Sequence, residues 1–416
     1  ADTMFVSWIS SDATSATQII FPLMLFASAI GLTFGVGAGS YISRLLGKND
    51  IEEANKVSST SFFTALGIGL VFTIINLVFA EEIFRLFGAN DDIIDLTLAY
   101  GNTIIIGYSF SILNMVFNNQ LRAEGSAKYS MIGMIIGSVL NIILDPILIF
   151  GFDMGIQGAA IATTFSQLVT TIILIIIYLK GKTVIKINLS MFKPSIKIYK
   201  EIFKVGIPTL FKQLLVSVSI ILLNIAAVST GGNDLLAAVG ILFKVTILPI
   251  YIIFGFGQGL QPVAGYNYGA NKQNRVMEAL KYTIRLCNIV GIITFILFFF
   301  FGESIFGIFK QGVYITELGT KGLRYYSIGI LSLGITNTIT MFYATIGKGK
   351  EALILSVTRQ GIFFIPIILI LPGIIGIDGV LLAQPIADVL TFILAVVMII
   401  PFVKKYKSSK PTLKEA

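Results

Sequence analysis

Asn141 and Asp145 stand four residues apart in an apolar stretch, so they lie on one face of a predicted helix. Pro146 follows directly and has no backbone N–H, which predicts a kink and a freed carbonyl near the carboxylate. Thr163 lies in the next apolar stretch, and Asp2 lies near the start of the chain. Carboxylate, amide and hydroxyl oxygens are hard ligands, so these side chains could bind a small cation such as Na⁺ or share a proton. The alternative is a polar network that holds neighbouring helices together.

Other charged residues also fall inside apolar stretches, where a charge at the bilayer centre costs roughly 2.5–3.5 kcal/mol. Arg359 lies about two turns into its stretch, and we expect its guanidinium to snorkel to the membrane surface. Lys212, Lys244 and Asp388 could form a buried pair or line a cavity, and a structural and a functional role stay equally open. Gln213 follows Lys212 and belongs to the same candidate group.

The composition supplies an apolar scaffold for these groups. Of 416 residues, 55% are hydrophobic and 12% are charged, whereas ordinary soluble domains carry about 25% charged residues. The mean hydropathy is +0.89. Several stretches without charge are longer than the roughly 20 residues that a helix needs to cross a bilayer. The sequence therefore predicts an all-α polytopic membrane protein.

The composition also excludes several functions. The chain has no histidine and one cysteine, Cys287, which excludes a His-based triad and a disulfide and argues against a His/Cys metal site. Gly47-Lys48 and Gly347-Lys348 lack the other residues of a phosphate-binding loop. We therefore expect neither an enzyme nor an ATP-driven pump, and no cofactor other than a coupling ion. Basic residues are scattered over loops, which indicates membrane topology and not nucleic-acid binding.

Reading the apolar stretches between charged loops predicts eleven membrane spans. A short apolar segment before them, residues 1–10, reads as the outer half of a truncated first helix, so we expect twelve spans in the full protein and no signal peptide. The eleven spans are predicted near residues 16–43, 57–80, 96–119, 129–152, 155–180, 203–229, 236–262, 278–302, 321–346, 350–373 and 377–403.

The charged loops predict the orientation. Most of the 30 lysines and arginines fall on alternate loops and in the C-terminal tail, and the opposite loops carry mainly acids. The positive-inside rule places the basic loops and both termini in the cytoplasm. Abundant lysine, isoleucine and asparagine indicate a bacterial source, which makes the cell membrane the expected location.

The two halves of the chain repeat each other. Gly35, Gly47 and Gly125 recur as Gly257, Gly269 and Gly347, a constant offset of 222 residues. GIQG at 155–158 recurs as GIDG at 376–379 with an offset of 221. Both copies start on the same side, so the repeat is parallel, and such halves usually enclose a substrate cavity at their interface.

This repeat predicts the domain organisation. We expect an N-lobe at 1–180, an exposed cytoplasmic linker at 181–200, a C-lobe at 201–403 and a basic tail at 404–416. The linker carries Pro194 and many lysines, which suit the anionic surface of a membrane. The glycine runs at 35–39 and 255–259 lie inside apolar spans, so we expect them to serve close helix packing and not nucleotide binding.

Long motifs in both halves resemble the multidrug and toxic compound extrusion (MATE) family, across essentially the whole chain. The motifs that carry the resemblance are DTMFVSW, GAGSYISRLLGKNDIEEA, LRAEGSAKYSM, VLNIILDPILIFGFDMGIQGAAIAT and FGFGQGLQPVAGYNYGANKQNRV. The resemblance implies a twelve-helix exporter with two six-helix lobes. Such an exporter exchanges inward H⁺ or Na⁺ for amphipathic, often cationic drugs, and the family default is a monomer.

The resemblance also implies which residues couple the ion. The DinF-like branch keeps its coupling site in the N-lobe, and its residues match Asp2, Asn141, Asp145 and Thr163. The NorM-like branch uses an acid on the seventh helix, where this chain carries Lys212-Gln213 and no acid. This departure favours the N-lobe site.

The sequence therefore predicts a cation/drug antiporter that works by alternating access, with membrane lipid and amphipathic, cationic small molecules as its partners. A lipid-linked oligosaccharide flippase of the same superfamily is the nearest alternative, since Lys212 and Lys244 could bind a pyrophosphate group. A channel or receptor suits the two unequal halves less well.

Overall fold

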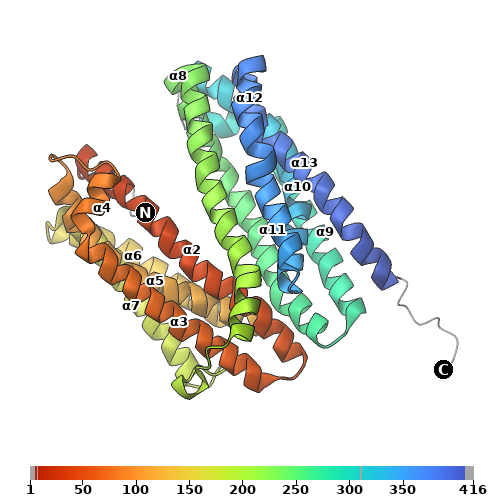
Figure 1. The fold of residues 1–416 in the computed structure, drawn as a ribbon. Helices are drawn as coiled ribbons and strands as arrows, with labels where there is room; N and C mark the ends of the chain where they lie inside the picture. The colour runs from red at the N-terminus through yellow and green to blue at the C-terminus, as the bar shows by residue number, and fades with distance from the viewer. Residues whose placement is uncertain (1–4, 7, 310–311, 408–416) are drawn as a thin grey trace. The chain divides into compact units, whose positions relative to one another are not determined.

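The computed structural model describes residues 5, 6, 8–309 and 312–407, so Asp2 lies outside the described residues. Within these ranges the chain forms helices and no strand, which confirms the all-α prediction. It divides into two compact units, Ala1–Gly206 and Ile207–Ala416 (Figure 1).

Five long helices build unit 1, and shorter elements lie between or after them. The elements are α2 (Ser11–Gly47), α3 (Ile51–Val78), α4 (Ala80–Leu86), α5 (Ile94–Ala123), α6 (Ala127–Pro146), the π-helix η1 (Ile147–Gly151), α7 (Gly155–Leu179) and the 3₁₀-helix η2 (Leu189–Met191). The helix α8 (Ile196–Gly269) begins in unit 1 and continues into unit 2.

Helix α5 is central to unit 1, because α2, α3 and α7 all pack against it. Glycines permit the close contact between α2 and α5. A Cβ at Gly35 would lie 2.9 Å from both the Met115 carbonyl oxygen and Asn119 Nδ2. The α6–α7 contact has the same cause, because a Cβ at Gly137 would overlap the Thr170 hydroxyl.

Unit 2 contains the rest of α8 and five further helices. They are α9 (Gln273–Gly307), α10 (Val313–Thr345), α11 (Gly349–Val357), α12 (Ile365–Ile375) and α13 (Ile377–Lys407), with the π-helix η3 (Thr358–Phe364) between α11 and α12. Within α8, Gly232 has φ 63° and ψ −158°, a conformation that is essentially restricted to glycine.

The backbone break at Gly232 determines how many membrane spans α8 contributes. Ten described helices are long and apolar enough to cross a membrane, and one of them is α8 with its 74 residues. The break at Gly232 divides α8 into two spans. The described part of the chain therefore contains the eleven predicted spans.

Two glycine contacts recur in both units. A Cβ at Gly257 would lie 2.8 Å from Asn337 Nδ2, which repeats the packing of Gly35 on Asn119. Gly379 packs on the backbone of Leu371 as Gly158 packs on the backbone of Leu148. The glycine runs therefore serve helix packing in part, although Gly255 and Gly259 face open space.

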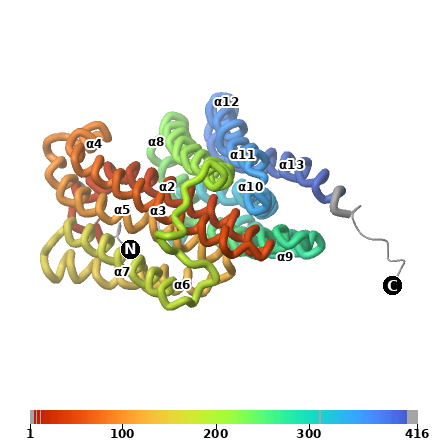
Figure 2. Tube along the Cα trace, turned by 60° about the horizontal axis from the view of Figure 1, so that its bottom comes forward, coloured from red at the N-terminus to blue at the C-terminus, as the bar shows by residue number. Residues whose placement is uncertain are grey.

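The segment between α7 and α8 differs from the exposed linker that we expected. Figure 2 shows it as the yellow-green tube that joins the two helices. Its lysine side chains are exposed, but its backbone is bound to α3. The backbone N–H groups of Lys186 and Lys193 donate to Asn55 Oδ1 at 2.7 Å and Thr60 Oγ1 at 3.2 Å. The segment therefore belongs to unit 1, and the boundary falls within α8, after Gly206.

Glu124, which lies between α5 and α6, also binds this segment. Its carboxylate accepts a hydrogen bond from the backbone N–H of Ile185 at 2.9 Å. Burial raises the pKa of the Glu124 carboxyl, and hydrogen bonds from Ile185, Ser126 and Val184 oppose the rise. The folded protein therefore holds the Glu124 proton more tightly than the unfolded chain does.

This raised pKa predicts a pH-dependent stability. The contribution of Glu124 is fully present below its unfolded pKa and is lost as the pH rises through its raised folded pKa. We expect Glu124→Gln, which keeps an acceptor for Ile185, to reduce the fall in melting temperature with pH above the ordinary glutamate pKa of 4.5. Thermal unfolding of both proteins in one detergent over a pH series measures this. Parallel curves for the two proteins would contradict it.

Candidate ion-coupling and substrate site

The side chain of Asp145 is fully buried, with an exposed fraction of 0%. It lies one turn along α6 from Asn141, so the two side chains share a helix face, as the spacing predicts. Asn141 Nδ2 donates to Asp145 Oδ1 at 3.2 Å and to Thr163 Oγ1 on α7 at 3.1 Å. The structure therefore brings together three of the four residues proposed for ion coupling.

The helix geometry changes directly after the carboxylate. Pro146 is the last residue of α6, and the π-helix η1 follows it. A proline cannot donate to the carbonyl one turn earlier, and π-turns in helices occur frequently at functional sites. Asp145 thus lies where the backbone leaves α-helical geometry.

The orientation of the Asn141 amide bears on what the site can bind. Its nitrogen donates to both Asp145 and Thr163, so its oxygen is turned away from them. A cation held by Asp145, Asn141 and Thr163 together would require the amide to rotate and present its oxygen.

A cavity of about 410 Å³ lies beside this network, between α5, α6 and α7. This volume is within the usual range for small-molecule sites. Asn141 and Thr163 belong both to the cavity wall and to the network of Asp145. The remaining lining residues are, apart from the aliphatic Ile142, small, polar or sulfur-containing: Ser111, Asn114, Met115, Asn118, Met134, Gly137, Ser138, Ser166, Gln167 and Thr170.

Apart from Thr163, the polar cavity residues on α5 and α7 were not predicted from the sequence. Asn114 Nδ2 donates to Gln167 Oε1 at 2.8 Å, and Asn114 Oδ1 accepts from Thr171 at 2.9 Å. The available signal was Asn114 and Asn118 at i and i+4 within an apolar span, the spacing that pointed to Asn141 and Asp145.

The charged residues of unit 2 pair differently from the prediction. Arg359 Nε donates to Asp388 Oδ1 at 2.7 Å, and the side chain of Asp388 is 6% exposed. Snorkelling of Arg359 to the membrane surface was therefore wrong, because a buried carboxylate on α13 holds its guanidinium. Gln384, one turn before Asp388, also donates to it, at 2.8 Å.

Lys212 and Lys244 do not bind Asp388. Lys244 is exposed, so the predicted buried pair was wrong for this residue. Lys212 is half-buried, and its ammonium lies 4.6 Å from the ring centre of Phe254. Gln213 is half-buried beside it. Among the described residues, no group of three or more His, Cys, Asp or Glu side chains could hold a metal ion.

Eleven apolar spans in two units, with a buried carboxylate beside a polar cavity, define a polytopic membrane transporter. The chain belongs to the MATE family, because the MatE family model matches residues 1–147 and 208–370. This confirms the resemblance found in the sequence motifs.

Relatives and solved structures agree with this assignment. The chain is 33% identical over 389 residues to the multidrug export protein MepA of Staphylococcus aureus, which covers 94% of this chain and 86% of that protein. A multidrug resistance MATE family transporter of the MOP superfamily, solved in an outward-facing conformation, matches with a TM-score of 0.92 at 27% identity and covers 98% of this chain and 92% of its own. A MOP superfamily transporter from Pyrococcus furiosus, whose binding pocket is described as having reverse polarity, matches with a TM-score of 0.91 at 27% identity, over 98% and 91% of the two chains.

Proposed function

We propose that this protein exports amphipathic, mostly cationic small molecules across a bacterial cell membrane in exchange for inward H⁺ or Na⁺. It works as a monomer in the lipid bilayer with both termini in the cytoplasm, and it catalyses no covalent reaction. The observation that carries the proposal is that Asn141 and Thr163 are shared between the network of the buried Asp145 and the wall of the cavity.

This sharing links the two ligands. When Asp145 is ionised and free of cation, its negative charge favours a cationic substrate in the adjoining cavity. When Asp145 takes up H⁺ or Na⁺, its charge is neutralised and the hydrogen bond that it accepts from the Asn141 amide becomes weaker. The affinity for the substrate then falls. By thermodynamic reciprocity, a bound substrate lowers the affinity for the cation by the same factor.

Alternating access turns this linkage into transport. The cation binds in the outward-open state and promotes release of the drug, and its release in the inward-open state restores the charge that attracts the next drug. Each ligand needs only to bind the two states unequally. The methionines of the cavity, Met115 and Met134, suit substrates of varied shape because their side chains are flexible and polarizable.

The test is ethidium efflux from vesicles that contain the protein, driven separately by a proton gradient and by a Na⁺ gradient. We expect efflux under one of the two gradients, and the ion of that gradient is then identified as the coupling ion. Absence of efflux under both, with the protein folded, would contradict the antiporter and favour the flippase.

A further inference from the structure

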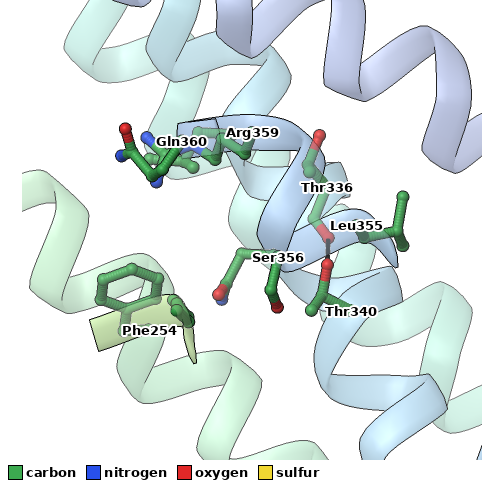
Figure 3. Close-up of a pocket in the computed structure, with 10 residues that line it drawn as sticks. Phe254, Thr336, Thr340, Leu355, Ser356, Arg359 and Gln360 are labelled. Carbon is green, nitrogen blue, oxygen red and sulfur yellow. Dashed lines mark hydrogen bonds between the residues drawn. The ribbon is translucent and has the colours of Figure 1, made fainter. Parts of the chain in front are cut away.

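A second cavity lies within unit 2 and is separate from the coupling site. It has a volume of about 20 Å³, and α8, α10, α11 and η3 line it. Figure 3 shows Arg359 and Gln360 of η3 above Ser356 of α11, with Phe254 of α8 on the opposite side. Lys212 of α8 completes the basic lining.

The lining carries an uncompensated positive charge. Asp388 neutralises Arg359 through the guanidinium Nε at 2.7 Å. In the part of the chain that the structure describes, Lys212 makes neither an ion pair nor a hydrogen bond, and its ammonium faces the Phe254 ring at 4.6 Å. An aromatic face attracts a cation but does not neutralise it, and charges inside membrane spans usually pair with an opposite charge.

Some hydrogen-bond donors of this cavity are already used, and others are not. The hydroxyls of Thr336 and Thr340 donate to backbone carbonyls at 3.0 and 2.8 Å, so they offer no donor to a ligand. Ser356 is 8% exposed, and its hydroxyl makes no hydrogen bond among the described residues. The terminal nitrogens of Arg359 likewise make none there. An ammonium, a guanidinium and a hydroxyl thus remain available to one acceptor.

The volume of the cavity limits which hydrogen-bond acceptor can bind there. About 20 Å³ exceeds the roughly 10–15 Å³ that one water needs, so the cavity holds a single small species. We infer that unit 2 binds a monovalent anion of the size of chloride between Lys212 and Arg359, with Ser356 as a third donor. This site goes beyond the proposed antiport and does not depend on it.

A water molecule is the competing occupant. It could donate to the buried Gln360 Oε1, which has no hydrogen-bond partner among the described residues. A water would leave the charge of Lys212 uncompensated, whereas an anion would neutralise it. The two occupants therefore differ in their response to the anion in solution.

The test compares melting temperatures of the purified protein in sodium chloride, bromide, acetate and gluconate at constant ionic strength. We expect a saturable rise of about 2–4 °C with chloride and bromide and none with gluconate. Lys212→Gln should abolish the rise. Lys244→Gln, which removes an exposed lysine of the same helix, should leave it unchanged.

Three outcomes would overturn the inference. They are an equal rise in all four salts, an undiminished chloride response in Lys212→Gln, and a response to acetate without one to chloride, which would require a larger site for carboxylates. If Lys212→Gln does not fold, anomalous diffraction from bromide-soaked crystals of the unmodified protein tests whether the anion site exists. A peak between Lys212 and Arg359 supports the site, and its absence from a well-ordered cavity contradicts it.

Discussion

Replacing Asp145 with asparagine is expected to abolish gradient-driven efflux while leaving the protein folded. Asparagine has nearly the same shape and still offers an oxygen to Asn141 Nδ2, so the network with Thr163 can persist. The asparagine side chain cannot take up a proton, and it cannot supply the negative charge that attracts a cation or a cationic drug. The coupling between the two ligands, typically roughly 5–150-fold in affinity, is therefore lost.

Ethidium efflux from vesicles, with the same gradients as for the unmodified protein, measures this loss. Asp153→Asn is the matched control, because it removes a carboxylate that follows η1 and is exposed to solvent. The backbone there has φ 55°, a conformation that asparagine tolerates. We expect this variant to keep full efflux. Normal efflux by Asp145→Asn would remove Asp145 from the mechanism.

Breaking the Arg359–Asp388 pair should give the largest loss of stability in unit 2. Arg359→Met leaves the carboxylate of Asp388, which is 6% exposed, with the Gln384 amide as its one hydrogen-bond partner among the described residues. Removing one member of a buried pair typically costs about 3–5 kcal/mol, because the other charge stays buried and uncompensated. Thermal or denaturant unfolding in detergent measures the change.

The double variant Arg359→Met/Asp388→Leu separates the two contributions. Replacing both members of a buried pair with apolar residues is often close to neutral, so we expect it to recover most of the lost stability. If the double variant is as unstable as the single one, the cost comes from lost packing around Arg359 and not from the buried charge.

The sequence predicted the parts of the site that depend on local spacing. Asn141 and Asp145 lie within one helix, and Thr163 follows after one short turn, so i,i+4 spacing and span order suffice to bring them together. The eleven spans followed from hydropathy, and the break in α8 lies at Gly232, between two predicted spans. Each of these features is determined by residues close together in the chain.

The Arg359–Asp388 pair could not be predicted from local spacing in the sequence. The two residues belong to different helices, so their contact depends on how η3 and α13 rotate against each other. Arg359 also lies in a π-helix, where each turn contains more residues than an α-helical turn. A helical wheel drawn at 3.6 residues per turn therefore misplaces its side chain.

The docking of the segment between α7 and α8 was missed for another reason. Its lysines and Pro194 are typical of an exposed linker, and those lysine side chains are indeed exposed. The contacts that attach it to α3 come from backbone N–H groups, which every residue except proline carries. No pattern of side chains in the segment indicates them.

In the proposed mechanism, binding of the substrate and binding of the coupling ion are linked through Asp145. The most direct measurement is the ethidium affinity of the purified protein at low and high pH and with and without Na⁺, with gluconate as the anion throughout. We expect ethidium affinity to fall when H⁺ or Na⁺ is added, and we expect Asp145→Asn to show one constant, weakened affinity. An affinity that does not respond to either ion, or an equal response in Asp145→Asn, would contradict it.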